Sequence, residues 1–226
     1  MQTEAEAFLQ HIRAYPDDDA PRLIYADWLE EQNLVHDLEW SPARALLIRI
    51  QIALARLSEE EVPTEEPKRR HRIVPDRETA KEKLRARLLV EELDLLAKHK
   101  EAWCAPFRGL ATGIEFRRGF VEKVNVQIRP WLRQAAELFA AGPVRHVQLL
   151  DLDKNLPLAF QCPYLSRLTG LRVFASHKGR PLARAVAESP HLAGLKQLAL
   201  DRNRFGDDSA EHIATSSFLA NLEELD

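Results

Sequence analysis

Two groups of residues near the N-terminus carry side chains that could do chemistry. The run at residues 17–19 is three consecutive aspartates, which could bind a divalent cation or cap the helix that follows. Tyr25, Asp27 and Trp28 share one helical turn, where they could line a ligand site or form a buried network with another helix or loop. We expect the structural alternative in both places.

A catalytic or metal site finds little support elsewhere in the sequence. Cys104 could be a nucleophile, but no acid or base motif accompanies it. The eight histidines and two cysteines show no paired metal spacing, and no phosphate-binding loop, nucleophile elbow or dinucleotide fingerprint occurs. We therefore expect no catalytic residues, no metal and no cofactor, and a protein that is not an enzyme.

The composition favours a globular protein of the cytoplasm. The chain has 226 residues, 45% of them hydrophobic, which is enough for a sizeable core. Two cysteines fit a reducing compartment, and the first segment of the chain, up to Ile12, lacks the continuous apolar run of a signal peptide. No stretch approaches the ~20 apolar residues that span a bilayer, so we expect no membrane partner.

A basic run at residues 68–72 could contact nucleic acid or an acidic partner. Glutamates at 59–61 and 65–66 precede it and would partly neutralise it, so we expect a flexible charged loop over residues 58–76. The formal net charge of -3 also argues against a nucleic-acid partner.

Helices dominate the chain up to Gly142. Apolar residues at helical spacing predict a bundle of three helices in residues 1–57 and a long fourth helix from about residue 77 to 103. Alternation on both sides of Gly119 predicts a β-hairpin, and Pro130 starts a further helix. Residues 77–142 therefore comprise a long helix, a hairpin and a capping helix.

The last part of the chain, residues 143–226, contains an internal repeat. Leu165, Leu192 and Leu219 are equally spaced, and two further leucine positions recur at the same interval, Leu168, Leu195 and Leu222 followed by Leu171, Leu198 and Leu225. The segment from Leu195 to Phe205 fits the pattern of a leucine-rich repeat, with Asn203 at the position where the chain bends. Such units stack into a solenoid with parallel strands on the concave side and helices on the convex side.

Two of the units depart from this pattern. Leu152 and Ser176 stand where the asparagine is expected, so both units are degenerate. The sequence stops at Asp226, within a fourth strand that would be left unpaired. We expect either a longer natural chain or a partner that covers this end.

The N-terminal motif from Glu6 to Leu9 and from Pro16 to Glu31, which includes Arg22-Leu23-Ile24-Tyr25-Ala26-Asp27-Trp28-Leu29, resembles the bacterial repeat-companion domain of planctomycetes and myxobacteria. Residues 102–103, 116–122 and 138–145 extend the likeness over roughly residues 4 to 150. The resemblance implies association with ribonuclease-inhibitor-like leucine-rich repeats, and it brings no catalytic residues. Residues 36–44 diverge from the family pattern.

These patterns predict an α/β fold in which an N-terminal helical bundle and a β-hairpin cap a short leucine-rich-repeat solenoid. Side chains that alternate with the inward leucines should face solvent on the concave side, and these are His146, Gln148, Leu150, Arg172, Phe174, Gln197, Ala199, Asp201 and Glu224. Arginine and phenylalanine are typical of interface hot spots, although the degenerate repeat could shield Phe174.

The expected function is noncovalent recognition of another protein through this concave face. The alternative is a regulatory or substrate-recruiting subunit whose N-terminal bundle docks an effector enzyme while the repeats select its target. The sequence does not name the partner in either case.

Overall fold

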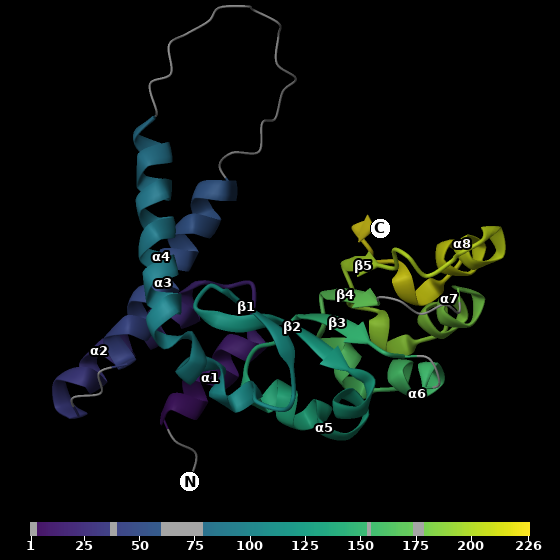
Figure 1. Cartoon of the computed structure of the whole chain (residues 1–226), viewed down its shortest axis with the longest axis horizontal. Coiled ribbons are helices and arrows are strands. Elements are labelled where there is room, and N and C mark those ends of the chain that lie inside the picture. The colour runs from purple at the N-terminus through teal and green to yellow at the C-terminus, as the bar shows by residue number, and fades with distance from the viewer. Residues whose placement is uncertain (1–3, 37–39, 60–78, 153–154, 174–178) are drawn as a thin grey trace, which may run out of the picture. The chain divides into compact units, whose positions relative to one another are not determined.

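The computed structural model of the chain describes residues 4–36, 40–59, 79–152, 155–173 and 179–226, and these residues form an α/β fold (Figure 1). The chain divides into two compact units. Unit 1 consists of Met1–Trp103 and Arg117–Phe120, and unit 2 of Cys104–Phe116 and Val121–Asp226. This division differs from the grouping predicted from the sequence, since most of residues 104–142 falls in unit 2.

Unit 1 contains the four helices that the periodicity predicts, and their bounds are α1 Glu4–Ala14, α2 Ala20–His36, α3 Trp40–Glu59 and α4 Ala80–Cys104. Capping interactions explain where helices α2 and α4 begin. Asp18 Oδ1 accepts the backbone N–H of Ala20 at 2.9 Å, and Thr79 and Glu82 exchange hydrogen bonds in a capping box at α4. The core of unit 1 packs apolar side chains of these helices, among them Ile12, Ala26, Leu29, Ile48 and Ile52.

Residues 117–120 form the turn of the predicted β-hairpin and belong to unit 1. Gly119 has φ +83°, a conformation that favours glycine, and its N–H donates to Gln51 Oε1 at 2.7 Å. A Cβ on Gly119 would lie 2.8 Å from Ile48 Cα, so the backbones of the turn and of α3 approach closely. The glycine is therefore required by both the turn and its packing.

Unit 2 is built on a six-stranded sheet with the order β1-β2-β3-β4-β5-β6. Neighbouring strands from β2 to β6 pair in parallel. The strands are β1 Thr112–Arg117, β2 Phe120–Gln127, β3 His146–Leu150, β4 Gly170–Val173, β5 Gln197–Ala199 and β6 Glu224–Leu225. The connecting helices are α5 Ile128–Ala141, α6 Leu156–Phe160, α7 Gly179–Ala187 and α8 Asp207–Ala214, with 3₁₀ turns η1 Ala105–Phe107, η2 Pro163–Arg167, η3 Pro190–Leu192 and η4 Ser217–Leu219.

The interval at which the leucines recur in the sequence also separates equivalent hydrogen bonds in the structure. Ser189 Oγ donates to the carbonyl of Phe160 at 2.7 Å, and Ser216 Oγ donates to the carbonyl of Ala187 at 2.6 Å. The two donors are separated by the same interval as Leu165 and Leu192, and so are the two acceptors. Two successive repeats therefore each join the preceding one through an equivalent hydrogen bond.

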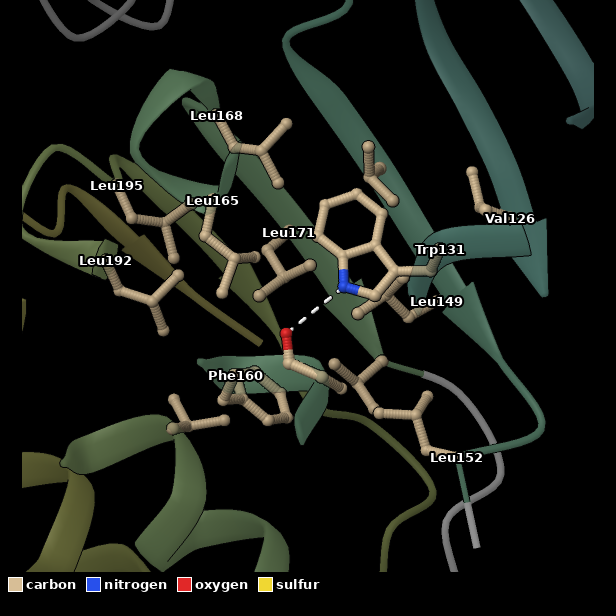
Figure 2. Close-up of a cluster of buried hydrophobic side chains, with 14 of the residues drawn as sticks. Val126, Trp131, Leu149, Leu152, Phe160, Leu165, Leu168, Leu171, Leu192 and Leu195 are labelled. Carbon is tan, nitrogen blue, oxygen red and sulfur yellow. Dashed lines mark hydrogen bonds between the residues drawn. The ribbon is translucent and has the colours of Figure 1, made fainter. Parts of the chain in front are cut away.

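The core of unit 2 lies between the sheet and these helices. Leucines of the repeat pack beneath the strands, and Trp131 of α5 is fully buried at the start of the stack (Figure 2). Its indole Nε1–H donates to the carbonyl of Ala159 at 3.1 Å, which satisfies the polar end of the ring. Leu225, expected to point inward, is 56% exposed because it lies on the edge strand β6.

Among the described residues, no helix combines the length and the apolar character that crossing a membrane requires.

Candidate protein-binding face

One face of the sheet in unit 2 carries polar side chains. We call it the open face and define it by the alternate residues of β2 to β6 and of the segments that follow them, Lys123, Asn125, Gln127, His146, Gln148, Leu150, Gly170, Arg172, Gln197, Ala199, Asp201 and Glu224. The intervening residues, such as Val147, Leu171 and Leu198, are buried. Parallel sheets are normally covered on both faces, so a polar, accessible face is a feature to explain.

The strand register arranges the open face in rows across the sheet. His146 pairs with Gly170, which pairs with Gln197, which pairs with Glu224. The next row along the strands runs through Asn125, Gln148, Arg172 and Ala199. Amide groups and one guanidinium therefore lie side by side, with both donors and acceptors of hydrogen bonds directed away from the core.

The ring of His146 lies over Gly170. A Cβ on Gly170 would collide with His146 Cδ2, so only glycine leaves room for the ring in this position. His146 is half-buried as a result. The glycine thus fixes where the imidazole sits on the open face.

Two ion pairs lie on the sheet, one near the centre of the open face and one at its β1 edge. Arg172 Nη2 lies 2.9 Å from Asp201 Oδ1, and the exposed fractions of the two side chains are 47% and 23%. At the β1 edge of the sheet, Lys123 Nζ lies 2.8 Å from Glu115 Oε1. These ion pairs hold the side chains in defined positions but contribute little to stability, because surface pairs are screened by water.

The predicted face residues lie on the open face, apart from Phe174, which is outside the described residues. Arg172, Gln197 and Glu224 are exposed, whereas the others are half-buried, namely His146, Gln148, Leu150, Ala199 and Asp201. The sequence did not identify Lys123, Asn125 and Gln127, because the hairpin pattern around β2 gave no sign that β2 pairs with β3. The alternation of buried Val124 and Val126 with polar residues was the available signal.

The aspartates of residues 17–19 act as structural groups. Asp18 caps α2, as expected, and Asp19 forms ion pairs with Arg56 at 3.2 Å and Arg118 at 3.8 Å. Among the described residues, no group of three or more histidine, cysteine or acidic side chains is placed to hold a metal ion.

The second N-terminal group, Tyr25, Asp27 and Trp28, does not form one site: the two aromatic rings and the aspartate make different contacts. Tyr25 and Trp28 stack at 5.6 Å and both contact the ring of Phe8, in an aromatic cluster between α1 and α2. Asp27 does join another helix, through an ion pair of 2.6 Å with Arg49 of α3, but its side chain is 66% exposed. The expectation of a buried network at Asp27 is therefore wrong, because Arg49 meets it at the surface.

Two arginines that the sequence did not single out organise unit 1. Arg22 is fully buried and donates to the carbonyls of Pro16 and Asp18, which closes the turn between α1 and α2. The guanidinium of Arg44 lies 5.0 Å from the centre of the Trp103 ring and 5.2 Å from that of Phe120. Both arrangements join elements of unit 1, so a structural role accounts for the two arginines.

The two cysteines are not joined in a disulfide. Cys104 and Cys162 are free thiols of intermediate exposure. Burial raises the pKa of the Cys162 thiol, which disfavours the reactive thiolate. The basic run at residues 68–72 and the rest of the predicted loop from residue 60 lie outside the described residues.

A shallow apolar groove of about 280 Å³ lies on unit 1 between α1 and α2. It is lined by Glu4, Ala7, Phe8, His11, Pro21 and Ile24. Ile24 is 54% exposed at its edge. An apolar side chain of another protein could bind there, so the groove is a second candidate site on the described surface.

Comparisons of the chain with protein-family models, with curated proteins and with solved structures found no match.

Proposed function

We propose that this protein is a non-enzymatic binding module that recognises a partner protein through the open face of unit 2. The observation that carries the proposal is the row of polar side chains from Asn125 through Gln148 to Arg172, in register on three parallel strands. A parallel sheet without a cover on one face presents a regular array that a complementary surface can match. The unit 2 fold is, in this proposal, a short leucine-rich-repeat solenoid, and unit 1 belongs to a repeat-companion domain.

Three features support recognition of a protein rather than of a small molecule. The open face extends over five strands and offers donors, acceptors and ion pairs over that whole breadth. Its half-buried side chains, such as His146 and Gln148, have less conformational freedom to lose on binding than fully exposed ones. Arg172 near the centre is of the type that is enriched at interface hot spots.

The test compares two charge reversals that each break one ion pair. Arg172→Glu removes the pair with Asp201 on the open face, and Arg180→Glu removes the pair with Asp208 at the helical side of unit 2. Partners captured from a native lysate with the parent chain are purified, and their affinities for both variants are then measured by calorimetry.

We expect Arg172→Glu to weaken binding by at least about tenfold and Arg180→Glu to leave it unchanged. Equal effects of the two variants, or none from Arg172→Glu, would place the partner elsewhere and contradict the proposal.

The second candidate function is a recruiting subunit whose N-terminal helices dock an effector enzyme. The apolar groove between α1 and α2, with the exposed Ile24 at its edge, favours it. Ile24→Glu should then abolish effector binding, whereas Arg172→Glu should not. A matched control is Glu31→Lys on the exposed surface of the same helix, which lies outside the residues that line the groove.

A further inference from the structure

Helix α4 carries an apolar stripe that the described part of unit 1 does not cover. Val90 and Leu93 are 59% and 66% exposed, and Leu89 beside them is 42% exposed. Ala86 and Ala97 extend the stripe by one turn at each end, and both are exposed. The spacing of residues 86, 90, 93 and 97 keeps the four on a single face of the helix.

The opposite face of α4 packs on unit 1. Trp103 is buried, Leu88, Leu95 and His99 are half-buried, and Gln51 of α3 donates to Glu92 at 2.5 Å. Figure 1 shows α4 beside α3. The helix is therefore oriented by one face, while its exposed stripe has the 4-3-4 spacing of a coiled-coil seam.

Charge along α4 changes sign at the centre of the stripe. The N-terminal side is mainly basic, and its charged residues are Lys81, Glu82, Lys83, Arg85 and Arg87. The next two turns carry Glu91, Glu92 and Asp94 and no basic residue. In an antiparallel pair of α4 helices, a basic residue that flanks the stripe before its centre can therefore lie beside an acidic residue that flanks the stripe after its centre on the other copy.

A specific antiparallel register satisfies both the apolar and the charged residues. With Val90 of one copy opposite Leu93 of the other, Ala86 faces Ala97, and each apolar layer occurs twice. At the flank of the seam, Arg87 then meets Asp94, and this pair also occurs twice.

A parallel, in-register pair would join Glu82 to Arg87 but would place Asp94 beside the apolar Leu89, whereas the antiparallel register gives Asp94 a cationic partner. Lys83 and Lys100 occupy the next seam positions in either orientation, so the apolar contact ends at Ala86 and Ala97.

We infer that the stripe Ala86, Val90, Leu93 and Ala97 of α4 is the interface of a homodimer, in which α4 pairs antiparallel with α4 of a second copy. The intrahelical ion pair of Arg87 with Glu91, 2.9 Å long and exposed, leaves the guanidinium at the edge of the stripe. This inference uses unit 1 alone and is independent of the function proposed for the open face.

The test is sedimentation of the full chain over a dilution series, with four variants. Leu93→Glu should weaken the dimer by at least about 100-fold, because the substitution enters the interface twice. Asp94→Arg should weaken it by about tenfold, since the introduced arginine would face Arg87. The double variant Arg87→Asp/Asp94→Arg restores the charge pairs and should return the affinity to within about threefold of the parent.

Lys98→Glu reverses an exposed charge on α4 outside the stripe and should leave the dimer intact. Circular dichroism shows whether each variant keeps its helices. A parent chain that sediments as a monomer at about 100 µM overturns the inference. So does a dimer that survives Leu93→Glu, and a dimer that the double charge swap fails to restore shows that the antiparallel register is wrong.

Discussion

Asn203 is a buried amide that supports the turn after β5. Its Nδ2 donates to the carbonyls of Val173 at 2.7 Å and Leu200 at 2.8 Å, with a longer contact to Asp201. The sequence predicted this role, since an asparagine at this position satisfies backbone groups where the chain bends. We expect Asn203→Ala to lower the free energy of unfolding by about 1 to 3 kcal/mol, because buried carbonyls lose their donor.

Urea denaturation measures this loss, and Asn221→Ala is its matched control. Asn221 Nδ2 makes one bond, to the carbonyl of Ala193, and the residue is exposed, so water replaces the donor. The control should cost less than about 1 kcal/mol. Equal losses in the two variants would mean that the burial of Asn203 does not determine how much its hydrogen bonds contribute to the free energy of unfolding.

Tyr25 should make the stability of the protein depend on alkaline pH. Burial raises the pKa of its hydroxyl above the ordinary value of 10.0, and the charge of Arg44 opposes this only in part. The unfolded chain therefore loses the Tyr25 proton first as the pH rises, and the free energy of unfolding falls above pH ~10. At neutral pH the hydroxyl is protonated in both states, and the shift contributes nothing.

The check is urea denaturation of the parent and of Tyr25→Phe from pH ~8 to pH ~11. The phenylalanine variant should lose less stability over this interval than the parent does. Parallel curves for the two proteins would show that another group accounts for the alkaline loss.

At the scale of elements, two glycines with nearly equal φ allow the cost of backbone strain to be measured apart from the cost of a steric clash. Gly119 has φ +83° and Gly109 has φ +79°, but a Cβ would meet Ile48 at Gly119 and nothing within 4 Å at Gly109. Gly109→Ala should cost about 1 kcal/mol through strain alone. Gly119→Ala should cost about 3 kcal/mol or more, because the turn at residues 117–120 must also move away from α3.

Thermal unfolding of the two variants measures the difference. Similar shifts in Tm would contradict the close packing of the turn on α3.

Hydrophobic periodicity predicted the four helices of unit 1, helix α5 and the hairpin, because these elements depend on neighbours within a few residues. The partners of those elements depended on contacts far apart in the chain. β2 joins β3 across the whole of α5, and His146 finds its place over Gly170 only through the register of β3 with β4. A pattern within either strand does not contain that information.

The same limit applies to the N-terminal motif. Its helices followed from spacing, whereas the burial of Arg22 and the exposure of Asp27 depended on where α3 and the turn at residues 117–120 lie in unit 1. Charged residues at the surface and in the core look alike in a sequence. Their environment therefore had to come from the structure.

At the scale of the whole molecule, dimerisation through α4 has a thermodynamic consequence. If the folded chain pairs and the unfolded chain does not, mass action stabilises the folded state more at higher protein concentration. The Tm of the parent should therefore rise over a hundredfold increase in concentration, and that of Leu93→Glu should not. Differential scanning fluorimetry with a dilution series measures both, and a Tm that is constant for the parent would contradict the dimer.

The hydrogen bonds that Ser189 and Ser216 make between successive repeats affect how such a chain can change length over evolution. Ser189 and Ser216 donate to acceptors at equivalent positions, Phe160 and Ala187, so the repeat between them accepts one of these bonds and donates the other. An in-frame duplication of one whole unit therefore creates a joint that already fits. Gain or loss of whole repeats would lengthen or shorten the open face while preserving the bonds within each repeat, so the breadth of that face can change separately from the stability of its parts.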